Sequence, residues 1–429
     1  MLSGRVPSDS IPNAWSRLLS ERRAAGAALI DLTEANPTRV GLSGVGVAEL
    51  AALATAEAMR YEPDPRGARA ARQAVAGYYR ERGLAADANE IVLTASTSEA
   101  YAHLFRLLAE PGQTFLVPAP SYPLFEPLAA LEGVRLRRYR LAWDGCWHLD
   151  LGSLEAAMDA GARGMIVVQP NHPTGSCLAP DELAAAEALC ERCGAALISD
   201  EVFGDFAWPS APGSAAAAAD RGGAPPRGDV EAPAGGETGS PAVGRGYEGG
   251  PSASLPSLLG SRRVPTFVLS GLSKVCGMPQ LKLGWMAVAG PEPARAEALR
   301  GLEWIADLFL SVATPVQVAL PRLLAGRHAW QARVRERIAA NLARLRAGLA
   351  RQPALDLLAG SGGWVAVVRV PRRRSEEEWA LELLRRGVVV HPGHFYDFEG
   401  EAYLVVSLIV APADFSRGVD TIEALAGEG

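Results

Sequence analysis

The sequence has few cysteines and no long hydrophobic run. Five cysteines in 429 residues form too sparse and too odd a set for a disulfide framework, so we expect reduced thiols and a cytoplasmic location. No apolar run reaches the ~18 residues that a membrane span requires, and the N-terminal segment lacks the apolar core of a signal peptide. We therefore expect no membrane partner.

An excess of basic residues is also absent. The formal net charge of -6 disfavours binding to nucleic acid, which is also negatively charged. Cys190 and Cys193 are the only closely spaced cysteine pair, and neither a second pair nor nearby histidines complete a zinc site, so we predict no metal. What is present is an ordinary globular composition, 48% hydrophobic and 21% charged, which is enough to build a sizeable core.

Short apolar runs alternate with helical patterns through the first two thirds of the chain. Most of the runs are nearly continuous Val, Ile and Leu, which is typical of strands covered on both faces. The predicted strands are 90–94, 114–118, 164–170, 195–200, 266–270 and 283–290, and the helices between them include 98–109, 123–131 and 181–193. This order predicts an α/β fold with a mostly parallel, doubly wound sheet.

The pattern changes after residue 290, which indicates a second, smaller α/β domain at 291–429. Long helices are predicted at 291–308 and 327–352, followed by strands at 363–370, 387–391 and 403–409 and a helix at 375–386. We predict a large domain at 46–290 and an N-terminal segment, 1–45, that packs with the small domain. Residues 209–262 are mostly Ala, Gly, Pro and Ser, which favours a disordered surface insertion.

Several polar residues follow predicted strands directly. Lys274 lies in the turn Ser-Gly-Leu-Ser-Lys; such a lysine is either a surface residue or a buried amine that serves as a nucleophile or Schiff base. Asp200 ends a buried strand and would point into the crevice where α/β proteins bind ligands. Residues 94–98 open a helix whose free backbone N–H groups suit an anion. Tyr122 ends another strand, where its ring is able to stack on a ligand.

Six motifs in order resemble the fold type I, pyridoxal phosphate (PLP)-dependent aminotransferases of class I/II, most of all the alanine-type enzymes. The motifs are "YEPDPRGARAARQAVAGYY", "SYP", "PNHPTG", "SDEV", "SGLSK" and "HPGHF". The resemblance covers nearly the whole chain outside the insertion. It implies transfer of an amino group from an amino donor to a keto acid through a lysine Schiff base and a pyridoxamine intermediate. It also implies a homodimer with shared active sites.

The resemblance implies a role for each matching residue. Lys274 corresponds to the lysine that forms the Schiff base and moves the substrate proton. Asp200 corresponds to the aspartate that pairs with the pyridinium nitrogen, and Tyr122 to the aromatic residue that stacks on the ring. The residues that correspond to phosphate ligands are Ser96, Thr97, Ser273, Lys282 and, from the neighbouring subunit, Tyr61.

Three positions depart from the family pattern around the cofactor. His172 replaces the asparagine that donates to the phenolic oxygen, with Asn171 one residue earlier as a candidate substrate contact; a histidine N–H is able to replace the amide, but it also titrates. Phe203 stands where a tyrosine hydroxyl usually reaches the same oxygen. Lys282 replaces an arginine, so the charge is kept and the bidentate fork is lost.

The largest departure is Val405, in "EAYLVVSLIVAP", where the family has the arginine that clamps the substrate carboxylate. Such a loss costs on the order of 2–5 kcal/mol of binding. One explanation is that another cation replaces the arginine; the candidates are Arg39, His391 and His394. The other is that the substrate has no carboxylate in the usual place. A small alignment shift does not rescue the arginine, because residues 401–412 contain none.

This departure keeps a second reaction type open, a PLP-dependent decarboxylase or β-lyase of the same fold, because sequence does not show which bond the site holds perpendicular to the ring. A third possibility, a non-catalytic sensor domain of a transcription regulator, is disfavoured. Those proteins carry a DNA-binding module ahead of the fold, whereas this chain is acidic and begins with only a short helix.

Overall fold

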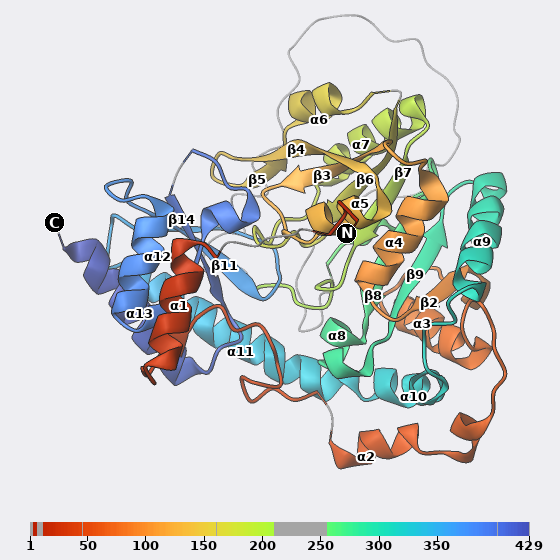
Figure 1. Ribbon diagram of the computed structural model, residues 1–429, viewed down its shortest axis with the longest axis horizontal. Helices are drawn as coiled ribbons and strands as arrows, with labels where there is room; N and C mark the ends of the chain where they lie inside the picture. The colour runs from red at the N-terminus through yellow and green to blue at the C-terminus, as the bar shows by residue number, and fades with distance from the viewer. Residues whose placement is uncertain are drawn as a thin grey trace, which may run out of the picture.

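A computed structural model describes residues 3–6, 12–44, 46–159, 161–209, 255–400 and 402–428. The chain builds an eight-stranded sheet in the order β2-β9-β8-β7-β6-β3-β4-β5 (Figure 1). Its strands are β2 (Ile91–Thr94), β3 (Thr114–Ala119), β4 (Arg135–Trp143), β5 (Trp147–Leu149), β6 (Ala162–Val168), β7 (Ala196–Asp200), β8 (Thr266–Gly271) and β9 (Gly284–Ala289). The central pairs from β8 to β4 are parallel, and β9 and β5 run antiparallel to their neighbours, so the predicted mostly parallel sheet is confirmed.

Helices cover both faces of this sheet, because successive strand residues point to opposite sides. Met165 packs with one hydrophobic cluster and Ile166 with another, which is the period-2 alternation of a strand buried on both faces. One face is covered by α3 (Arg69–Glu81), α6 (Leu151–Ala157), α7 (Pro180–Cys193) and α10 (Thr314–Ala325). The other is covered by α4 (Thr97–Leu108), α5 (Phe125–Glu132) and α9 (Glu292–Asp307).

The sequence missed β4, which carries four arginines and alternates between exposed and buried residues. Only the edge position of the strand makes this composition possible, because one flank pairs with β3 while the short β5 covers just its far end. Continuous apolar runs therefore identify central strands better than edge strands.

A second sheet of four antiparallel strands lies beside the first, in the order β10-β11-β14-β13. Its strands are β10 (Asp356–Leu358), β11 (Val365–Val370), β13 (His391–Pro392) and β14 (Ala402–Ser407). Three helices pack with it: α11 (Arg327–Leu349), α12 (Glu376–Arg385) and α13 (Pro412–Gly427). The predicted strands and helix of this region are present, and β10 is an additional strand.

The N-terminal segment packs with this second part of the chain. Helix α1 (Ala14–Ala24) lies against α12, and β1 (Ile30–Asp31) pairs in parallel with β12 (Val388–Val389) (Figure 1). A short helix, α2 (Val47–Leu50), then leads towards α3. Helices α9 and α10 follow residue 290 but pack on the large sheet, and the exact domain boundaries at residues 45 and 290 stay a prediction.

Most of the predicted insertion, residues 210–254, lies outside the described residues. Its last part differs from the prediction, because Leu258 and Leu259 are buried in the core of the large sheet. The backbone N–H of Leu258 also donates to the buried carboxylate of Glu201 at 2.8 Å. Residues 255–262 therefore belong to the packed structure. Among the described residues, no helix combines the length and the apolar character that crossing a bilayer would need.

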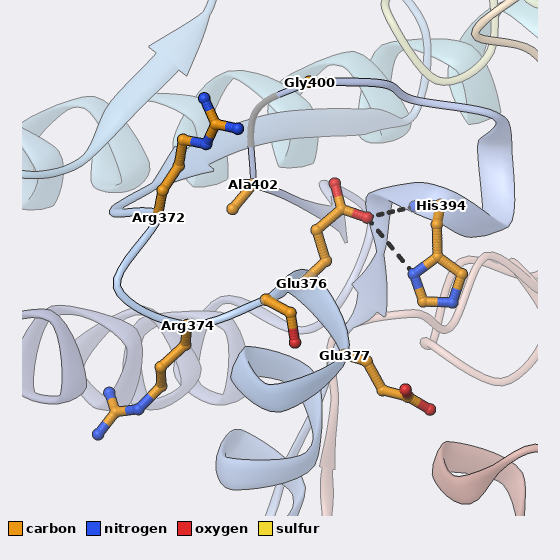
Figure 2. Close-up of a pocket in the computed structure, with 8 residues that line it drawn as sticks. Arg372, Arg374, Glu376, Glu377, His394, Gly400 and Ala402 are labelled. Atoms are coloured by element: carbon orange, nitrogen blue, oxygen red, sulfur yellow. Dashed lines mark hydrogen bonds and ion pairs between the residues drawn. The ribbon is translucent and has the colours of Figure 1, made fainter.

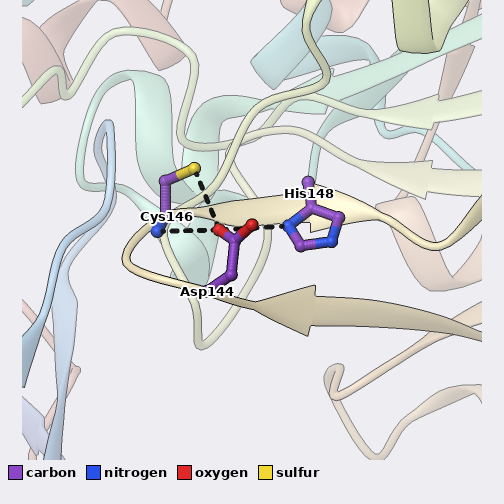
Figure 3. A group of neighbouring side chains, drawn as sticks. All are labelled: Asp144, Cys146 and His148. Carbon is purple, nitrogen blue, oxygen red and sulfur yellow. Dashed lines mark hydrogen bonds and ion pairs between the residues drawn. The ribbon is translucent and has the colours of Figure 1, made fainter. Parts of the chain in front are cut away.

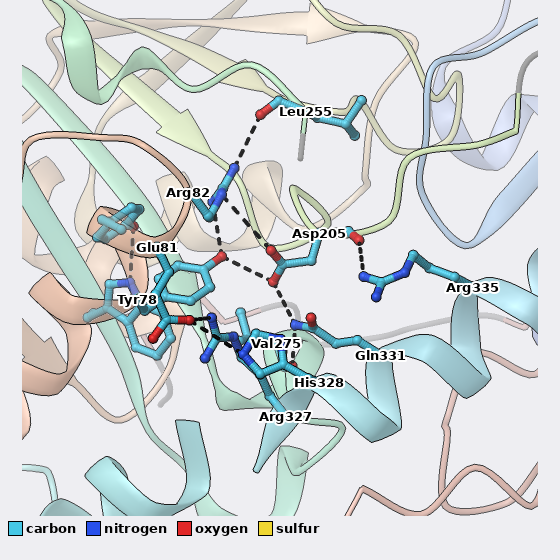
Figure 4. A network of polar contacts seen from close by, with 12 residues as sticks. Tyr78, Glu81, Arg82, Asp205, Leu255, Val275, Arg327, His328, Gln331 and Arg335 are labelled. Atoms are coloured by element: carbon cyan, nitrogen blue, oxygen red, sulfur yellow. Dashed lines mark hydrogen bonds and ion pairs between the residues drawn. The ribbon is translucent and has the colours of Figure 1, made fainter. Parts of the chain in front are cut away.

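A buried polar network joins the two parts of the chain (Figure 4). The carboxylate of Asp205 accepts from the hydroxyl of Tyr78 at 3.1 Å and from Nε2 of Gln331 at 2.9 Å, and it lies 4.0 Å from Arg82. Gln331, on α11, also donates to the carbonyl oxygen of Val275 at 2.9 Å. Because Val275 follows Lys274, this network fixes the Lys274 turn against α11.

We predict that Asp205→Ala destabilises the fold by about 3–5 kcal/mol, because it leaves a buried guanidinium without its carboxylate. Arg82 is only 5% exposed in its side chain. The free energy of unfolding in urea measures the effect. The control Asp414→Ala removes an exposed ion pair to Arg417 and should leave the unfolding midpoint nearly unchanged. Equal midpoints for the two variants would show that the network contributes no stability.

Candidate active site

A cavity of about 530 Å³ opens between the two sheets. The large sheet contributes its carboxyl-end residues: β7 ends at Asp200, and β8 leads directly into the short helix α8 (Leu272–Val275), which carries Lys274. The second sheet contributes residues of β11, β13 and β14. Of the residues predicted from sequence, the cavity brings together Ser96, Thr97, Tyr122, His172, Asp200, Phe203, Ser273, Lys274, Lys282, His391 and Val405.

Lys274 is a buried amine among aromatic rings. Its Nζ lies 4.7 Å from the ring centroid of Trp364 and 5.4 Å from that of Phe203. Burial lowers the pKa of Lys274 to about 8, and the carboxylate of Asp200 opposes this shift. A usable fraction of the amine is therefore neutral near pH 7, as a nucleophile requires.

Lys274 and Lys282 are the only lysines in the sequence, and both line this cavity. The remaining 40 of the 42 basic Lys and Arg residues are arginines. A chain that otherwise uses arginine keeps a primary amine only at these two positions. The small number of lysines would by itself have singled out both positions in the sequence, but the motif-based prediction did not use it.

Asp200 is a buried carboxylate held by two donors. Its Oδ1 accepts from the backbone N–H of Val202 at 3.2 Å, and its Oδ2 accepts from the hydroxyl of Tyr101 at 3.1 Å. Burial raises the pKa of Asp200 to about 6, while the two hydrogen bonds act in the opposite direction. The carboxylate is thus mostly ionised at pH 7, and a positively charged partner would stabilise it.

Tyr101 was missed by the sequence-based prediction. It lies on α4, four residues after Thr97, and residues at this spacing share one face of a helix. This spacing from the expected anion site at the helix start could have indicated that Tyr101 faces the cavity. The second part of the chain supplies further lining residues that sequence did not indicate: Trp364, Val365, Tyr396 and Ser407.

One end of the cavity is suited to an anion. Ser96 is the N-cap of α4, and its Oγ accepts from the N–H of Glu99 at 3.2 Å, which leaves the N–H groups of Thr97 and Ser98 without a partner inside the helix. Gly284 brings the backbone close, since an added Cβ would lie 3.2 Å from the carbonyl carbon of Ser96. Ser273 and Lys282 line the same cavity.

His172 lies at the centre of an aromatic cluster. Its ring stacks on Phe203 at 5.8 Å between centroids with an 18° interplanar angle, and it meets Tyr122 and Tyr396 edge-on at 5.5 Å each. Burial lowers the pKa of His172 to about 3, and Lys274 and His391 add to the shift. We therefore expect His172 to be a neutral ring with one N–H near pH 7, and its titration in the loaded protein stays a prediction.

Val405 lies on β14, where its neighbours are uncharged. It faces His391 on β13 and Val367 on β11 in the strand register. Nδ1 of His391 is 2.8 Å from the hydroxyl of Tyr396. Burial lowers the pKa of His391 to about 4, so it provides no positive charge near neutral pH.

Two of the candidate substrate contacts lie outside the cavity. Asn171 donates from Nδ2 to the carbonyl oxygen of Pro120 at 3.0 Å and to the hydroxyl of Thr174 at 2.9 Å, so it holds the turn together. His394 lines a separate surface pocket, where its backbone N–H and its ring contact Glu376 (Figure 2).

Two further predicted residues point away from the cavity. Arg39 is 74% exposed in its side chain and is paired with Glu34 at 3.4 Å. Tyr61 is 80% exposed and lines a different surface pocket, which includes Leu310. The predicted contact of Tyr61 with a second subunit stays a prediction.

A third group of polar side chains lies on the hairpin between β4 and β5 (Figure 3). The ligand atoms of Asp144, Cys146 and His148 are within 4.8 Å of one another, although no metal site was predicted from sequence. The thiol of Cys146 donates to the carboxylate of Asp144 at 3.5 Å. This is a local contact between two residues of the same turn. This group does not line the cavity.

Comparison with known families agrees with this geometry. The family model "Aminotransferase class I and II" matches residues 29–408. The chain belongs to this family. Class I and II aminotransferases are PLP-dependent enzymes, so PLP is the cofactor that the cavity should fit.

Several curated relatives of this aminotransferase-family chain are named for amino-group transfer. Nicotianamine aminotransferase 1 from Oryza sativa subsp. japonica is 27% identical over 263 residues, which are 60% of this chain and 44% of the relative. Tyrosine aminotransferase from Mus musculus is 27% identical over 59% of this chain and 47% of its own length. An S-alkyl-thiohydroximate lyase from Arabidopsis thaliana is 28% identical over 59% of this chain and 47% of its own length. The matches thus span about half the length of these relatives.

Solved structures support the fold. Alanine aminotransferase from Pyrococcus furiosus superimposes with a TM-score of 0.80 over 100% of both chains, at 20% identity. An aminotransferase from Escherichia coli gives a TM-score of 0.78 at 18% identity, over 100% of this chain and 98% of that one. At these identities the likeness shows the fold alone.

The residues of the cavity fit PLP. A buried amine suits the aldehyde, a buried and mostly ionised carboxylate suits a protonated ring nitrogen, and the start of α4 with Ser273 and Lys282 suits a phosphate. At Gly284 the backbone approaches Ser96 so closely that an added Cβ would be crowded.

We predict that His172 stays neutral from pH 5 to pH 8.5 in the folded protein, because burial holds its pKa near 3. Histidine-labelled protein without cofactor, observed by NMR, should contain a His172 signal that does not shift in this range. The signal is assigned by its loss in His172→Asn. The same titration in denaturing urea is the control, since an exposed histidine titrates near pH 6.5. A folded-state midpoint between pH 5 and pH 8.5 would contradict the buried neutral ring.

Proposed function

We propose that this protein is a PLP-dependent aminotransferase that moves an amino group from an amino donor to a carbonyl acceptor, a keto acid in the family pattern. The observation that carries this proposal is the buried amine of Lys274, which shares one cavity with the buried carboxylate of Asp200. Such a pair of shifted groups in a cavity is typical of a catalytic site.

The proposed roles follow from the contacts. The amine of Lys274 would hold the cofactor aldehyde, and it is placed to move the proton at the substrate carbon that bears the amino group. The carboxylate of Asp200 would keep a proton on the ring nitrogen, and the hydroxyl of Tyr101 orients that carboxylate. His172 offers a neutral N–H beside the ring, and the rings of Tyr122 and Phe203 exclude water. When bound, PLP supplies an electron sink for the bond that breaks at that carbon.

The phosphate is best held by the anion end of the cavity. The residues proposed to contact it are Ser96, Thr97, Ser273 and Lys282. Lys282 acts there as a point charge, because an ammonium cannot form the two parallel bonds of a guanidinium. The backbone φ angle of Lys282, 50°, lies in the left-handed region, two residues before β9 begins.

A homodimer is part of the proposal, as is a cytoplasmic location. Exposed apolar side chains mark protein–protein contact surfaces. Those of this chain include Met59, Tyr61, Trp304, Leu308 and Phe309, and Tyr61 lines one surface pocket with residues that follow α9. Tyr61 would then approach the phosphate of the partner subunit's cofactor.

The cofactor link is predicted at Lys274, and the lysine count makes the test sharp. Borohydride reduction of the PLP-loaded protein should fix the cofactor on the peptide that contains Lys274, as read by mass spectrometry. Lys274→Ala should abolish this label, whereas Lys282→Arg should keep it. Because the sequence offers only these two lysines, a label on Lys282 in the unaltered protein would refute the assignment.

The second candidate reaction, decarboxylation or β-elimination, is supported by the lyase relative and by Val405. The products separate the candidates. An aminotransferase converts the loaded cofactor to its amino form in one turnover and releases a carbonyl product without free ammonia or carbon dioxide. Stoichiometric release of either gas would favour the second candidate.

Tyr101→Phe tests the proposed hold on Asp200. Removing a hydrogen bond to a charged group loses about 1.5–3 kcal/mol, so we expect the dissociation constant of PLP to rise at least tenfold. Equilibrium dialysis measures it. The matched control is Tyr139→Phe, which removes another buried hydroxyl, bonded to the carbonyl oxygen of Ile166 at 2.7 Å and outside the cavity. Equal PLP affinity for both variants would exclude the role of Tyr101.

A further inference from the structure

The wall that the second sheet contributes to the cavity is apolar and aromatic. Val365 and Val405 are buried neighbours in one hydrophobic cluster with Tyr396, and Trp364 lies beside Lys274. The N-terminal segment adds Thr33 and Ala35. A substrate amine that approaches Lys274 must therefore place the rest of its body against this wall.

The positive charges of the cavity come from two residues of the large sheet's turns. Of the described residues that line it, the basic side chains other than histidine are Lys274 and Lys282. Lys274 is needed for the chemistry, and Lys282 lies with the phosphate-binding residues. None of the arginines in the described part of the chain lines the cavity, although arginine makes up 40 of the 42 Lys and Arg residues. A carboxylate on the substrate would thus find no cationic partner among the described lining residues of this chain, which is unfavourable.

The two nearest alternatives do not supply that partner. His391 faces Val405 across the strand pair and is occupied by the hydroxyl of Tyr396, and burial keeps its ring neutral. Arg39 follows the lining residues Thr33 and Ala35 in sequence, but its guanidinium is exposed and pairs with Glu34. The neutral His391–Tyr396 pair is suited to an uncharged group of the substrate.

We infer that the amino donor of this cavity is a primary amine with an aryl or alkyl body and no carboxylate on the carbon that bears the amino group. This inference rests on the proposed function and narrows it. Because one cavity serves both half-reactions, the acceptor is a carbonyl compound that binds against the same wall. The exchange balances: the donor carbon is oxidised to a carbonyl, the acceptor carbon is reduced to an amine, and no further oxidant is needed.

Matched donor pairs that differ only by the carboxylate test the inference. The PLP-loaded protein is mixed separately with 2-phenylethylamine or phenylalanine, and with 3-methylbutylamine or leucine. The rate of cofactor conversion and the carbonyl product are measured against concentration. We expect each amine to be favoured over its amino acid at least tenfold in kcat/KM. An amino acid that reacts as fast as its amine overturns the substrate class and leaves the aminotransferase proposal intact.

Val405→Arg should reverse the preference by placing a cation on the apolar wall. We expect the ratio of amino acid to amine kcat/KM to rise at least tenfold, while the uncharged control Val405→Met leaves it unchanged. Retained PLP absorbance and an unaltered unfolding midpoint establish that the variant folds. If the arginine variant does not fold, Arg39→Gln decides: an unchanged ratio supports the inference, and a selective loss of amino-acid reaction overturns it.

The failure of the proposed function has a different signature. If neither member of any pair converts the cofactor, although borohydride still fixes PLP on Lys274, the aminotransferase proposal itself fails and the substrate class fails with it. Release of carbon dioxide from the amino acids, with no reaction of the amines, leads to the same conclusion.

Discussion

The burial of one amine beside one carboxylate is the constraint on which the rest of this site depends. Lys274 and Asp200 both lie where water is excluded, and burial moves the pKa of each towards neutrality. Burying either charged group alone would carry a large desolvation free energy. Their arrangement is stable because strand ends, a helix start and two donors to Asp200 hold them in the same cavity.

The second sheet completes this environment and decides what else enters it. Trp364 and Phe203 bring their ring faces to the amine of Lys274, where a cation and an aromatic quadrupole attract each other. The same sheet places Val405 opposite His391, so the far wall carries no charge near neutral pH. The Asp205 network then joins α11 to the Lys274 turn, which couples the stability of the two parts of the chain to the geometry of the site.

Much of the fold was predictable because its central strands are buried on both faces. Continuous apolar runs identified β6, β7 and β8, and the helices between them followed from their length and spacing. The edge strand β4 was missed because its four arginines interrupt any continuous apolar run, and β10 because it has only three residues. Residues 255–262 were placed in the insertion, since a short apolar pair in a Ser- and Pro-rich stretch gives little periodicity.

Sequence by itself determined the chemistry of the large sheet: polar residues placed directly after buried parallel strands must meet at one edge, so Lys274, Asp200 and the Ser96 turn were found together. Only the tertiary structure decided the rest. Tyr101 reaches Asp200 from a neighbouring helix, and Arg39, His394 and Asn171 point elsewhere, because contacts between distant elements depend on how those elements pack. The neutral state of His172 was likewise decided by packing, since a pKa reflects desolvation and neighbouring charge, which no local sequence records.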